Sequence, residues 1–567
     1  MNSNNKIACP LDCYDACQAQ IVNDNIKGSK EHFLTNGKLC VNFANLLKEE
    51  FLNTAKYEGK DILLDEALNI LVSKLKETNP IDTLYYKGSG NLGVMQGSPK
   101  TFFSQYGATL TKGSLCDGAG GAGLELGRKK VVNPPIENLI NSDVIIVWGR
   151  NFSVTSPHMY NLVKDKTFIT IDPIKTDIAK KSVLHMQLSP KTDHELALLL
   201  TRFAYMEDIE DEEFIQNSQG ADWFFDLAKS RPVVSFEKTT GVSLSDVTKF
   251  YEIIKDKKVA MLIGLGVQKY YEGAQIIRAI DSYAAYIGLH NKDVGGVWYL
   301  GNSMYGYEKK FTSTTKNKVP IPEVDFSKYK LVFIQGGNPV VTAPNTQKVV
   351  EGLKDPFVIY FGTTINDTCE YADLIIPAKT FLEKKDVRLS YGHELKAINN
   401  VEDKSIENRI SEYELTAYLR KIFGWEALED EDSIIEYYSN TKVEANHFID
   451  DFEFIEDLDI ENLYEDKGEQ QFYLVTAKSK KTLNSQFGKD DNIYLHSSRG
   501  FNNGDEVLVS SEHGEAKFIV CLNDDVKEDC ALFYSSNRKV NYLTPFRSDE
   551  EAYSAIYHEA LLTIELC

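Results

Sequence analysis

Four cysteines near the start of the sequence restrict the fold more than any other feature. Cys9, Cys13 and Cys17 follow one another at intervals of four residues, and Cys40 comes later. A cubane [4Fe–4S] cluster needs four thiolates that converge on its corners, and a compact loop of three cysteines with a returning fourth supplies them. The alternative is a structural zinc site, but zinc ribbons usually pair their ligands as CxxC, and this spacing does not divide into two such pairs. The pattern therefore predicts a [4Fe–4S] cluster held by Cys9, Cys13, Cys17 and Cys40.

Short, nearly continuous apolar segments recur along most of the chain. They alternate with segments whose apolar residues follow helical spacing, such as residues 62–78 and 194–206. Strands that read as unbroken apolar runs are typical of parallel sheets covered on both faces. The expected strands are residues 83–87, 144–148, 168–171, 259–263, 331–334, 357–361 and 374–376. We therefore expect an α/β fold.

The charge balance excludes some partners. The chain of 567 residues carries 62 Lys and Arg against 84 Asp and Glu, a formal net charge of −22. This excess of negative charge disfavours nucleic acid as a partner. No apolar run is long enough to span a bilayer, and the residues before Cys9 show neither an apolar signal region nor a twin-arginine pair. We expect a cytoplasmic protein with no membrane span.

Several further motifs follow the cysteines in a characteristic order. They are CPLDCYDAC at 9–17, GSGNLG at 88–93, GSLCDGAGGAG at 113–123, VWGRNFSVTSPH at 147–158, IDPIKTDIA at 171–179, LSPKTDHELAL at 188–198, QGGNP at 335–339 and YADLIIPAKTFLE at 371–383. In this order the motifs resemble the molybdopterin oxidoreductases of the dimethyl-sulfoxide-reductase superfamily. The resemblance covers nearly the whole chain. It implies an oxidoreductase with Mo or W held by bis-molybdopterin guanine dinucleotide, acting on a small-molecule substrate.

The resemblance also suggests how the chain divides into domains. We expect an N-terminal [4Fe–4S] lobe at 1–55 and a discontinuous α/β cofactor domain at 56–135 and 325–425 around a second α/β cofactor domain at 136–324. Residues 426–470 are rich in Asp and Glu and are expected to form a solvated acidic connector. Short strands and turns in 471–567 predict a small C-terminal β-barrel. Both α/β domains should be doubly wound parallel sheets.

Cys116, in GSLCDGAG, stands where relatives with a cysteine or selenocysteine metal ligand place that residue. A thiolate suits a soft, sulfur-rich coordination sphere, and the small residues after it would let a bulky cofactor approach the backbone. A buried packing cysteine is the alternative. Asp117 follows where formate dehydrogenases of this superfamily typically have His, which argues against formate oxidation.

The resemblance assigns further residues to the two guanine dinucleotides. Helix N-termini that follow strands offer unpaired N–H groups to a pyrophosphate. The candidate residues are Gly149, Arg150, Asn151, Asp172, Thr176, Thr192 and Asp193 for one dinucleotide, Gly337, Asn338 and Pro339 for the other, and Thr476, Lys478, Asn484, Gln486 and Asn541 from the barrel. Any single Asn, Asp or Thr among them could instead be a helix cap or turn residue. His158 and His393 lie near these loops, and a structural role is favoured for both.

Two alternatives remain at this point. Gly88-x-Gly90-x-x-Gly93 matches a nicotinamide-dinucleotide fingerprint, but the acidic residue expected at the end of a second strand is missing. The other alternative is a non-catalytic electron-transfer subunit resembling the large iron–sulfur subunit of respiratory complex I. Asn42 favours it, because relatives usually place Lys or Arg there. The single cluster motif predicts a separate electron-transfer protein as redox partner.

Overall fold

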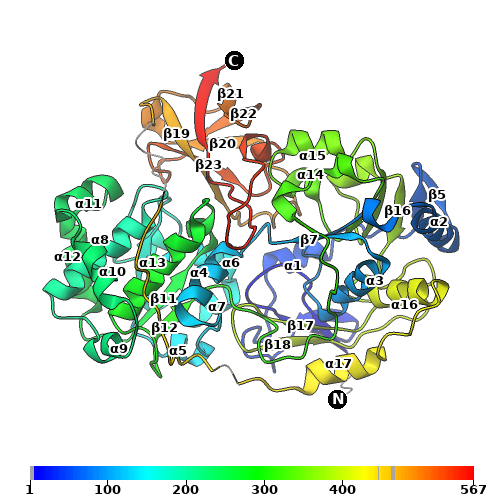
Figure 1. Cartoon of the computed structure of the whole chain (residues 1–567), viewed down its shortest axis with the longest axis horizontal. Helices are drawn as coiled ribbons and strands as arrows, with labels where there is room; N and C mark the ends of the chain where they lie inside the picture. The colour runs from blue at the N-terminus through cyan, green and yellow to red at the C-terminus, as the bar shows by residue number, and fades with distance from the viewer. Residues whose placement is uncertain (1–4, 445, 461–466) are drawn as a thin grey trace.

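A computed structural model describes residues 5–444, 446–460 and 467–567. Its fold confirms the α/β class and the closed C-terminal barrel. In Figure 1 the barrel lies at the top, and two α/β regions lie on either side below it. No helix in the described ranges combines the length and the apolar character needed to cross a membrane.

The first α/β region contains a five-stranded parallel sheet in the order β10-β9-β8-β11-β12. The strands are β8 (Val144–Trp148), β9 (Thr167–Ile171), β10 (Leu184–Met186), β11 (Val259–Ile263) and β12 (Gly296–Trp298). Every side chain of β8 and β11 is buried, as expected for a sheet covered on both faces. The helices are α5 (Ile136–Ile140), α6 (Phe152–Thr155), α7 (Pro157–Val163), α8 (Asp193–Met206), α9 (Glu212–Gln216), α10 (Ala221–Lys229), α11 (Val233–Thr240), α12 (Leu244–Ile254) and α13 (Gly273–Tyr286).

The second α/β region contains an eight-stranded sheet in the order β13-β7-β6-β14-β15-β16-β4-β5. Six strands are parallel: β6 (Thr83–Lys87), β7 (Thr109–Lys112), β13 (Lys318–Pro320), β14 (Leu331–Gln335), β15 (Phe357–Gly362) and β16 (Leu374–Pro377). An antiparallel hairpin of β4 (Ala55–Tyr57) and β5 (Lys60–Ile62) completes one edge. The helices are α2 (Leu64–Glu77), α3 (Ser98–Tyr106), α14 (Pro339–Thr342), α15 (Thr346–Gly352) and α16 (Glu412–Ile422).

Local sequence chemistry explains where several of these helices begin and end. Ser411 and Glu414 form a capping box at the start of α16, with Ser411 Oγ accepting from the Glu414 N–H at 3.1 Å. Helix α3 ends at Gly107, whose φ of +96° closes the last turn at little steric cost. Helices α2 and α8 confirm the helical patterns at 62–78 and 194–206.

The N-terminal lobe and the barrel complete the described chain. The lobe has a three-stranded sheet of β1 (Lys6–Ala8), β2 (Gln18–Val22) and β3 (Asn25–Gly28), followed by α1 (Val41–Leu46). A hairpin of β17 (Asp386–Leu389) and β18 (Lys396–Asn399) packs beside it. The barrel strands are β19 (Gln471–Ala477), β20 (Asn492–Leu495), β21 (Glu506–Ser511), β22 (Gly514–Leu522), β23 (Cys530–Tyr534) and β24 (Leu561–Leu566).

The acidic segment 426–470 differs from the expected solvated connector. It begins with helix α17 (Glu431–Asn440), and its later part packs against the first α/β region. Four apolar side chains of this part are buried in that core, namely Ile449, Phe452, Phe454 and Ile455. Arg278 and Lys129 pair with Glu453, so the acidic side chains find cations on the same surface. The expectation of a solvated segment was wrong for these residues, because their aromatic and aliphatic side chains bury themselves between the acidic ones.

The helix after Cys116 also packs differently from the expectation. Helix α4 (Ala119–Arg128) lies against α13 of the first α/β region. A Cβ added at Gly120 would overlap the buried ring of Tyr299, and one added at Gly123 would overlap the Ala274 carbonyl. These two glycines therefore allow close packing within the protein, whereas the sequence suggested that Gly120, with Gly118, Ala119 and Gly121, makes room for a cofactor.

Candidate functional site

Both parallel sheets change winding direction at one point. In the first sheet β9 and β10 extend from one side of β8, whereas β12 extends from the far side of β11. In the second sheet β7 and β13 extend from β6, whereas β15 and β16 extend from β14. The loops after the carboxyl ends of two such neighbouring strands diverge and leave a crevice, which is where open α/β sheets bind ligands. The fold therefore offers two crevices, one between β8 and β11 and one between β6 and β14.

Glycines stand at each of these strand ends, and the packing requires them. Gly149 follows β8 with φ +59°, and a Cβ there would overlap the side chain of Val267. Gly264 follows β11, and its Cβ would overlap the Gly149 carbonyl. In the second sheet a Cβ at Gly88 would lie 2.5 Å from the Gly337 Cα. These glycines therefore let the loops at the two strand ends of each crevice pack closely against one another.

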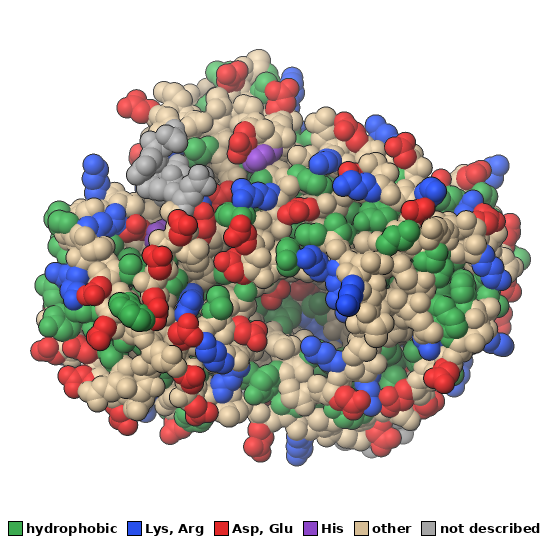
Figure 2. Space-filling view, in the orientation of Figure 1, with side chains coloured by type: hydrophobic (Ala, Val, Ile, Leu, Met, Phe, Trp, Pro, Cys, Tyr) green, Lys and Arg blue, Asp and Glu red, His purple; other side chains and the backbone are tan. Residues whose placement is uncertain are grey.

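A single cavity of about 1130 Å³ joins the two crevices, the cysteine loop and the barrel. Figure 2 shows its hollow between the two α/β regions, with Lys and Arg side chains along the rim. Ligand pockets for drug-sized molecules usually measure about 300–1,000 Å³, so this one has room for a larger molecule. The candidate residues that line it are Cys9, Cys13, Cys17, Cys40, Cys116, Gly149, Arg150, Asn151, Asp172, Thr176, Asp193, Gly337, Asn338, Thr476, Lys478, Asn484, Gln486 and Asn541.

Two candidate residues lie off the cavity wall. Thr192 is buried at the N-cap of α8, and its hydroxyl donates to the Ser189 carbonyl at 2.6 Å. Pro339 is the first residue of α14, a position that suits the fixed φ of proline. Each of the two residues is next in sequence to one that does line the cavity, Asp193 beside Thr192 and Asn338 beside Pro339.

Buried polar atoms without partners gather at the first crevice. Arg150 is 6% exposed; its guanidinium lies over the Tyr14 ring at 4.2 Å, and Nη2 donates to Ser156 Oγ at 3.1 Å. The Nη1 atom of Arg150 and Oδ1 of Asn151 are buried and have no hydrogen-bond partner within the described chain. Unsatisfied buried polar groups cost about 1–3 kcal/mol each, so native proteins keep them mainly where a ligand satisfies them. A free guanidinium nitrogen on this wall fits a bound phosphate.

Two buried carboxyl groups lie on the same wall. Burial raises the pKa of Asp172 to about 7 and that of Asp193 to about 7. Asp172 also accepts from the Ile174 N–H at 2.8 Å, and Asp193 accepts from the Trp148 indole at 2.7 Å. Both residues thus have a structural partner and line the cavity, and their role in binding a dinucleotide stays a prediction.

Cys116 also lines the cavity, on a loop held mainly through its backbone. Its N–H donates to Ser114 Oγ at 2.9 Å, and its carbonyl accepts from Gln268 at 2.8 Å and from Lys269. Burial raises the pKa of the Cys116 thiol to about 12, and the nearby Asp12 and Asp117 add to the effect. Without a metal this thiol is protonated at neutral pH, whereas a bound metal ion would stabilise its thiolate.

The three cysteines of the first loop are fixed by backbone hydrogen bonds. The Cys9 N–H donates to the Cys17 carbonyl at 2.9 Å, and Cys40 follows as the N-cap of α1. Four thiolates around one zinc ion at about 2.3 Å would lie less than about 4 Å apart. In the described ranges no three of the four cysteine sulfurs lie within 4.8 Å of one another. The [4Fe–4S] cluster at these four cysteines stays a prediction.

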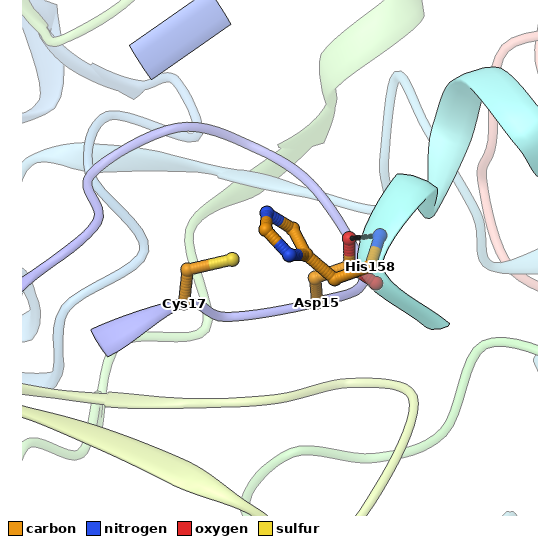
Figure 3. Close-up of side chains that lie close together, drawn as sticks. All are labelled: Asp15, Cys17 and His158. Carbon is orange, nitrogen blue, oxygen red and sulfur yellow. Dashed lines mark hydrogen bonds between the residues drawn. The ribbon is translucent and has the colours of Figure 1, made fainter. Parts of the chain in front are cut away.

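Cys17 lies beside Asp15 and His158 (Figure 3), and the possible ligand atoms of these three residues all lie within 4.8 Å of one another. The Asp15 carboxylate accepts from the backbone N–H groups of His158 at 2.8 Å and Met159 at 3.2 Å. It thereby caps α7 and ties that helix to the cysteine loop. His393 contacts the Asp15 carbonyl at 3.2 Å through Nε2, which supports the structural role expected for that histidine.

The structure adds wall and support residues that the sequence motifs did not identify. Gln268 and Lys269 follow β11 and hold the Cys116 loop, and Arg388 in β17 holds the cysteine loop. The sequence pattern that could have identified Lys269 is a polar residue shortly after the carboxyl end of a buried strand. The signal for Arg388 is a lone arginine between apolar residues of a short strand.

Comparison with known proteins identifies the fold and its cavity. A sequence model of the molybdopterin oxidoreductases matches residues 65–411, more than half of the chain. The chain belongs to the molybdopterin oxidoreductase family. Membership confirms the family expected from the sequence and, with it, the expected molybdopterin cofactor with molybdenum or tungsten.

Characterised and named relatives lie at low identity. The chain is 28% identical over 436 residues to the probable oxidoreductase YyaE of Bacillus subtilis, covering 69% of this chain and 64% of the relative. It is 22% identical to the assimilatory nitrate reductase catalytic subunit of the same organism, covering 66% and 62% of the two chains. The chain thus spans less than two thirds of the length of these relatives. Acetylene hydratase from Pelobacter acetylenicus has the same fold, with a TM-score of 0.76 at 15% identity over 99% of this chain and 100% of the other.

Proposed function

We propose that this member of the family is a molybdenum- or tungsten-dependent oxidoreductase that carries bis-molybdopterin guanine dinucleotide and one [4Fe–4S] cluster. The observation that carries the proposal is the single cavity that reaches both crevices, Cys116 and all four N-terminal cysteines. A chain that bound only a nicotinamide dinucleotide would need one crevice, and a chain that only transferred electrons would need no thiol between the two.

Each part of the cavity wall suits one part of the proposed cofactors. Arg150 and the backbone after Gly149 would bind phosphate at the first crevice, and Asn338 with the backbone after Gly336 would serve the second. Lys478 and Asn541 would close over the dinucleotides from the barrel. The pterin-bound metal supplies two-electron redox chemistry when it is present.

The residues around Cys116 would hold the thiol toward the metal. Gln268 and Lys269 fix the carbonyl of Cys116, while Ser114 fixes its N–H, so the side chain has little freedom apart from its own rotamers. Ser554 Oγ donates to the Asp117 carbonyl at 2.9 Å and links this loop to the C-terminal part of the chain. Preorganisation of this kind is what a protein contributes to a metal centre.

The substrate is a small molecule, and electrons pass to or from a separate protein through the cluster. Asp117 makes formate an improbable substrate even though an F420-dependent formate dehydrogenase subunit alpha of Methanocaldococcus jannaschii is 26% identical over 315 residues, 49% of this chain and 45% of that one. A cytoplasmic location is part of the proposal. The relatives named above give no support to the alternative of a non-catalytic subunit.

Anaerobic purification followed by metal and pterin analysis tests the proposal. We expect about four Fe and about one Mo or W per chain, with two pterin dinucleotides and no stoichiometric Zn. Zinc in place of iron would reject the cluster. Iron without molybdenum, tungsten or pterin would reject the catalytic proposal and favour the electron-transfer subunit.

A further inference from the structure

One arginine holds the loop that carries three of the four N-terminal cysteines. Arg388 lies in β17 and is 1% exposed. Its Nη1 donates to the Cys9 carbonyl at 2.6 Å and to the Leu11 carbonyl, and its Nη2 donates to the Cys13 carbonyl at 2.6 Å. A single planar group thus fixes three carbonyls of one short loop, which requires the fork geometry of a guanidinium.

The charge of Arg388 has no carboxylate opposite it. No Asp or Glu oxygen in the described ranges lies within 4.0 Å of its nitrogens, and its Nε has no hydrogen-bond partner there. Another buried arginine, Arg128, is paired with Asp281 at 2.5 Å. Asp15 lies on the same loop as the cysteines, but its carboxylate accepts from the N–H groups of α7. Asp12, on the cysteine loop, acts on Arg388 electrostatically without forming an ion pair with it. Carbonyl groups satisfy the donors of Arg388 but carry no net charge, and a buried charge is stabilised by an opposite charge in contact with it.

The thiols of Cys9 and Cys13 interact electrostatically with the charge of Arg388. Burial raises the pKa of the Cys9 thiol to about 11, while Arg388 acts in the opposite direction. The same opposition acts on Cys13, where burial is again the larger effect. Four thiolates around a cubane carry a net negative charge in both oxidation states, so a cluster in this place would supply the missing anion.

We propose that Arg388 is the buried countercharge and the positioning residue of the [4Fe–4S] cluster, and that it raises the cluster's midpoint potential. The inference rests on the proposed function, because it needs the cluster at these four cysteines. Reduction adds one electron to the cluster and breaks no bond. Since a nearby buried cation stabilises the more negative, reduced state more strongly than the oxidised state, removing the charge disfavours reduction.

The test compares Arg388→Gln with Arg388→Lys in the anaerobically purified, full-length protein. Iron content and the low-temperature paramagnetic signal report assembly, and a redox titration of that signal reports the midpoint potential. We expect the glutamine variant to lower the equilibrium constant for reduction at least tenfold, which is a shift of 59 mV or more toward negative potential. The lysine variant keeps the charge and should shift less. Arg278→Gln is the matched control, since that arginine is also largely buried but donates to the segment around Glu453 and Phe454.

The outcomes separate this inference from the proposed function. Wild-type protein without iron would reject the proposed cluster itself. Iron-loaded wild type whose potential is unchanged in Arg388→Gln would reject only the role of Arg388, as would an equal shift in the Arg278→Gln control. Loss of iron from the glutamine variant together with its retention in the lysine variant would support the role. If the glutamine variant does not fold, the lysine variant, which keeps the charge but not the guanidinium fork, decides the charge role. Retained iron with a shift of less than 59 mV would support it, and retained iron with a shift of 59 mV or more would reject it.

Discussion

Replacing Gly120 or Gly121 by alanine should have opposite effects, although the two glycines are neighbours in α4. At Gly121 an added Cβ meets no heavy atom within 4 Å. At Gly120 it would lie 2.8 Å from Cε1 of the Tyr299 ring and would overlap its hydroxyl. Tyr299 is fully buried, and its hydroxyl donates to Gln268 at 2.6 Å, so the ring cannot move freely.

The magnitudes follow from packing and from helix propensity. Alanine stabilises a helix relative to glycine by about 0.5–1 kcal/mol, and this gain should dominate at Gly121. Forcing an extra carbon into a packed core costs about 1–3 kcal/mol. At Gly120 the net effect should therefore be a destabilisation of about 1–2 kcal/mol. Because Gln268 also holds the Cys116 carbonyl, the Gly120→Ala change should disturb the loop that carries the proposed metal ligand.

Differential scanning calorimetry and metal analysis of the two variants provide the assay. For a domain of 150–250 residues, a change of 1 kcal/mol shifts the melting temperature by about 2–4 °C. We expect Gly120→Ala to melt several degrees lower and to bind less Mo or W, and Gly121→Ala to melt at or slightly above the wild-type temperature. Equal shifts of the same sign in both variants would refute the argument from Tyr299.

Three further predictions concern the cysteines and one buried ion pair. Cys13→Ser should lose the iron and its paramagnetic signal, while Cys530→Ser, at a buried cysteine of the barrel, should keep both. Full iron content in Cys13→Ser would contradict the assignment of Cys13 as a cluster ligand. Cys116→Ser should show one metal–sulfur bond fewer than wild type by X-ray absorption at the Mo or W edge, and Cys369→Ser should match wild type; equal sulfur coordination at equal metal occupancy in Cys116→Ser would contradict ligation. Arg128 and His290 hold the pKa of the buried Asp281 well below its usual value of 3.8, against the effect of burial. The contribution of Asp281 to the free energy of unfolding is therefore present above about pH 4 and is lost as the pH falls further. Asp281→Asn should lower the free energy of unfolding by about 3–5 kcal/mol at neutral pH, and its stability should depend less on acid pH than that of wild type. Calorimetry across this pH range measures both effects.

Strand ends and their glycines were predictable because the signal is local. The apolar run 144–148 is followed at once by Gly149, and the run 331–334 is followed by Gln335 and Gly336. This pattern is enough to predict a strand, a loop and a ligand crevice. The grouping of Cys9, Cys13 and Cys17 was likewise predictable, because it is a regular spacing within one short segment. What remained open is which crevices share one cavity, since that depends on how two sheets and the barrel pack.

Residues that act through distant contacts could not be predicted in this way. Arg388 is 379 residues away from Cys9 in sequence, and nothing near it in the chain shows that its donors reach the cysteine loop. The role of Gly120 depends on the ring of Tyr299, which comes from after β12. The prediction of a solvated segment at 426–470 was wrong for a related reason. Its charge dominates the composition, whereas the alternating Phe452 and Phe454 determine how it packs.

The barrel has a consequence for how the enzyme must be made. It follows every other element of the fold along the chain, yet it supplies Lys478, Asn484 and Asn541 to the cavity wall. A nascent chain that has not yet released the barrel from the ribosome has both sheets but an open cavity. A molecule in this cavity can therefore be fully enclosed only after the barrel has been synthesised and has folded, whenever the molecule enters.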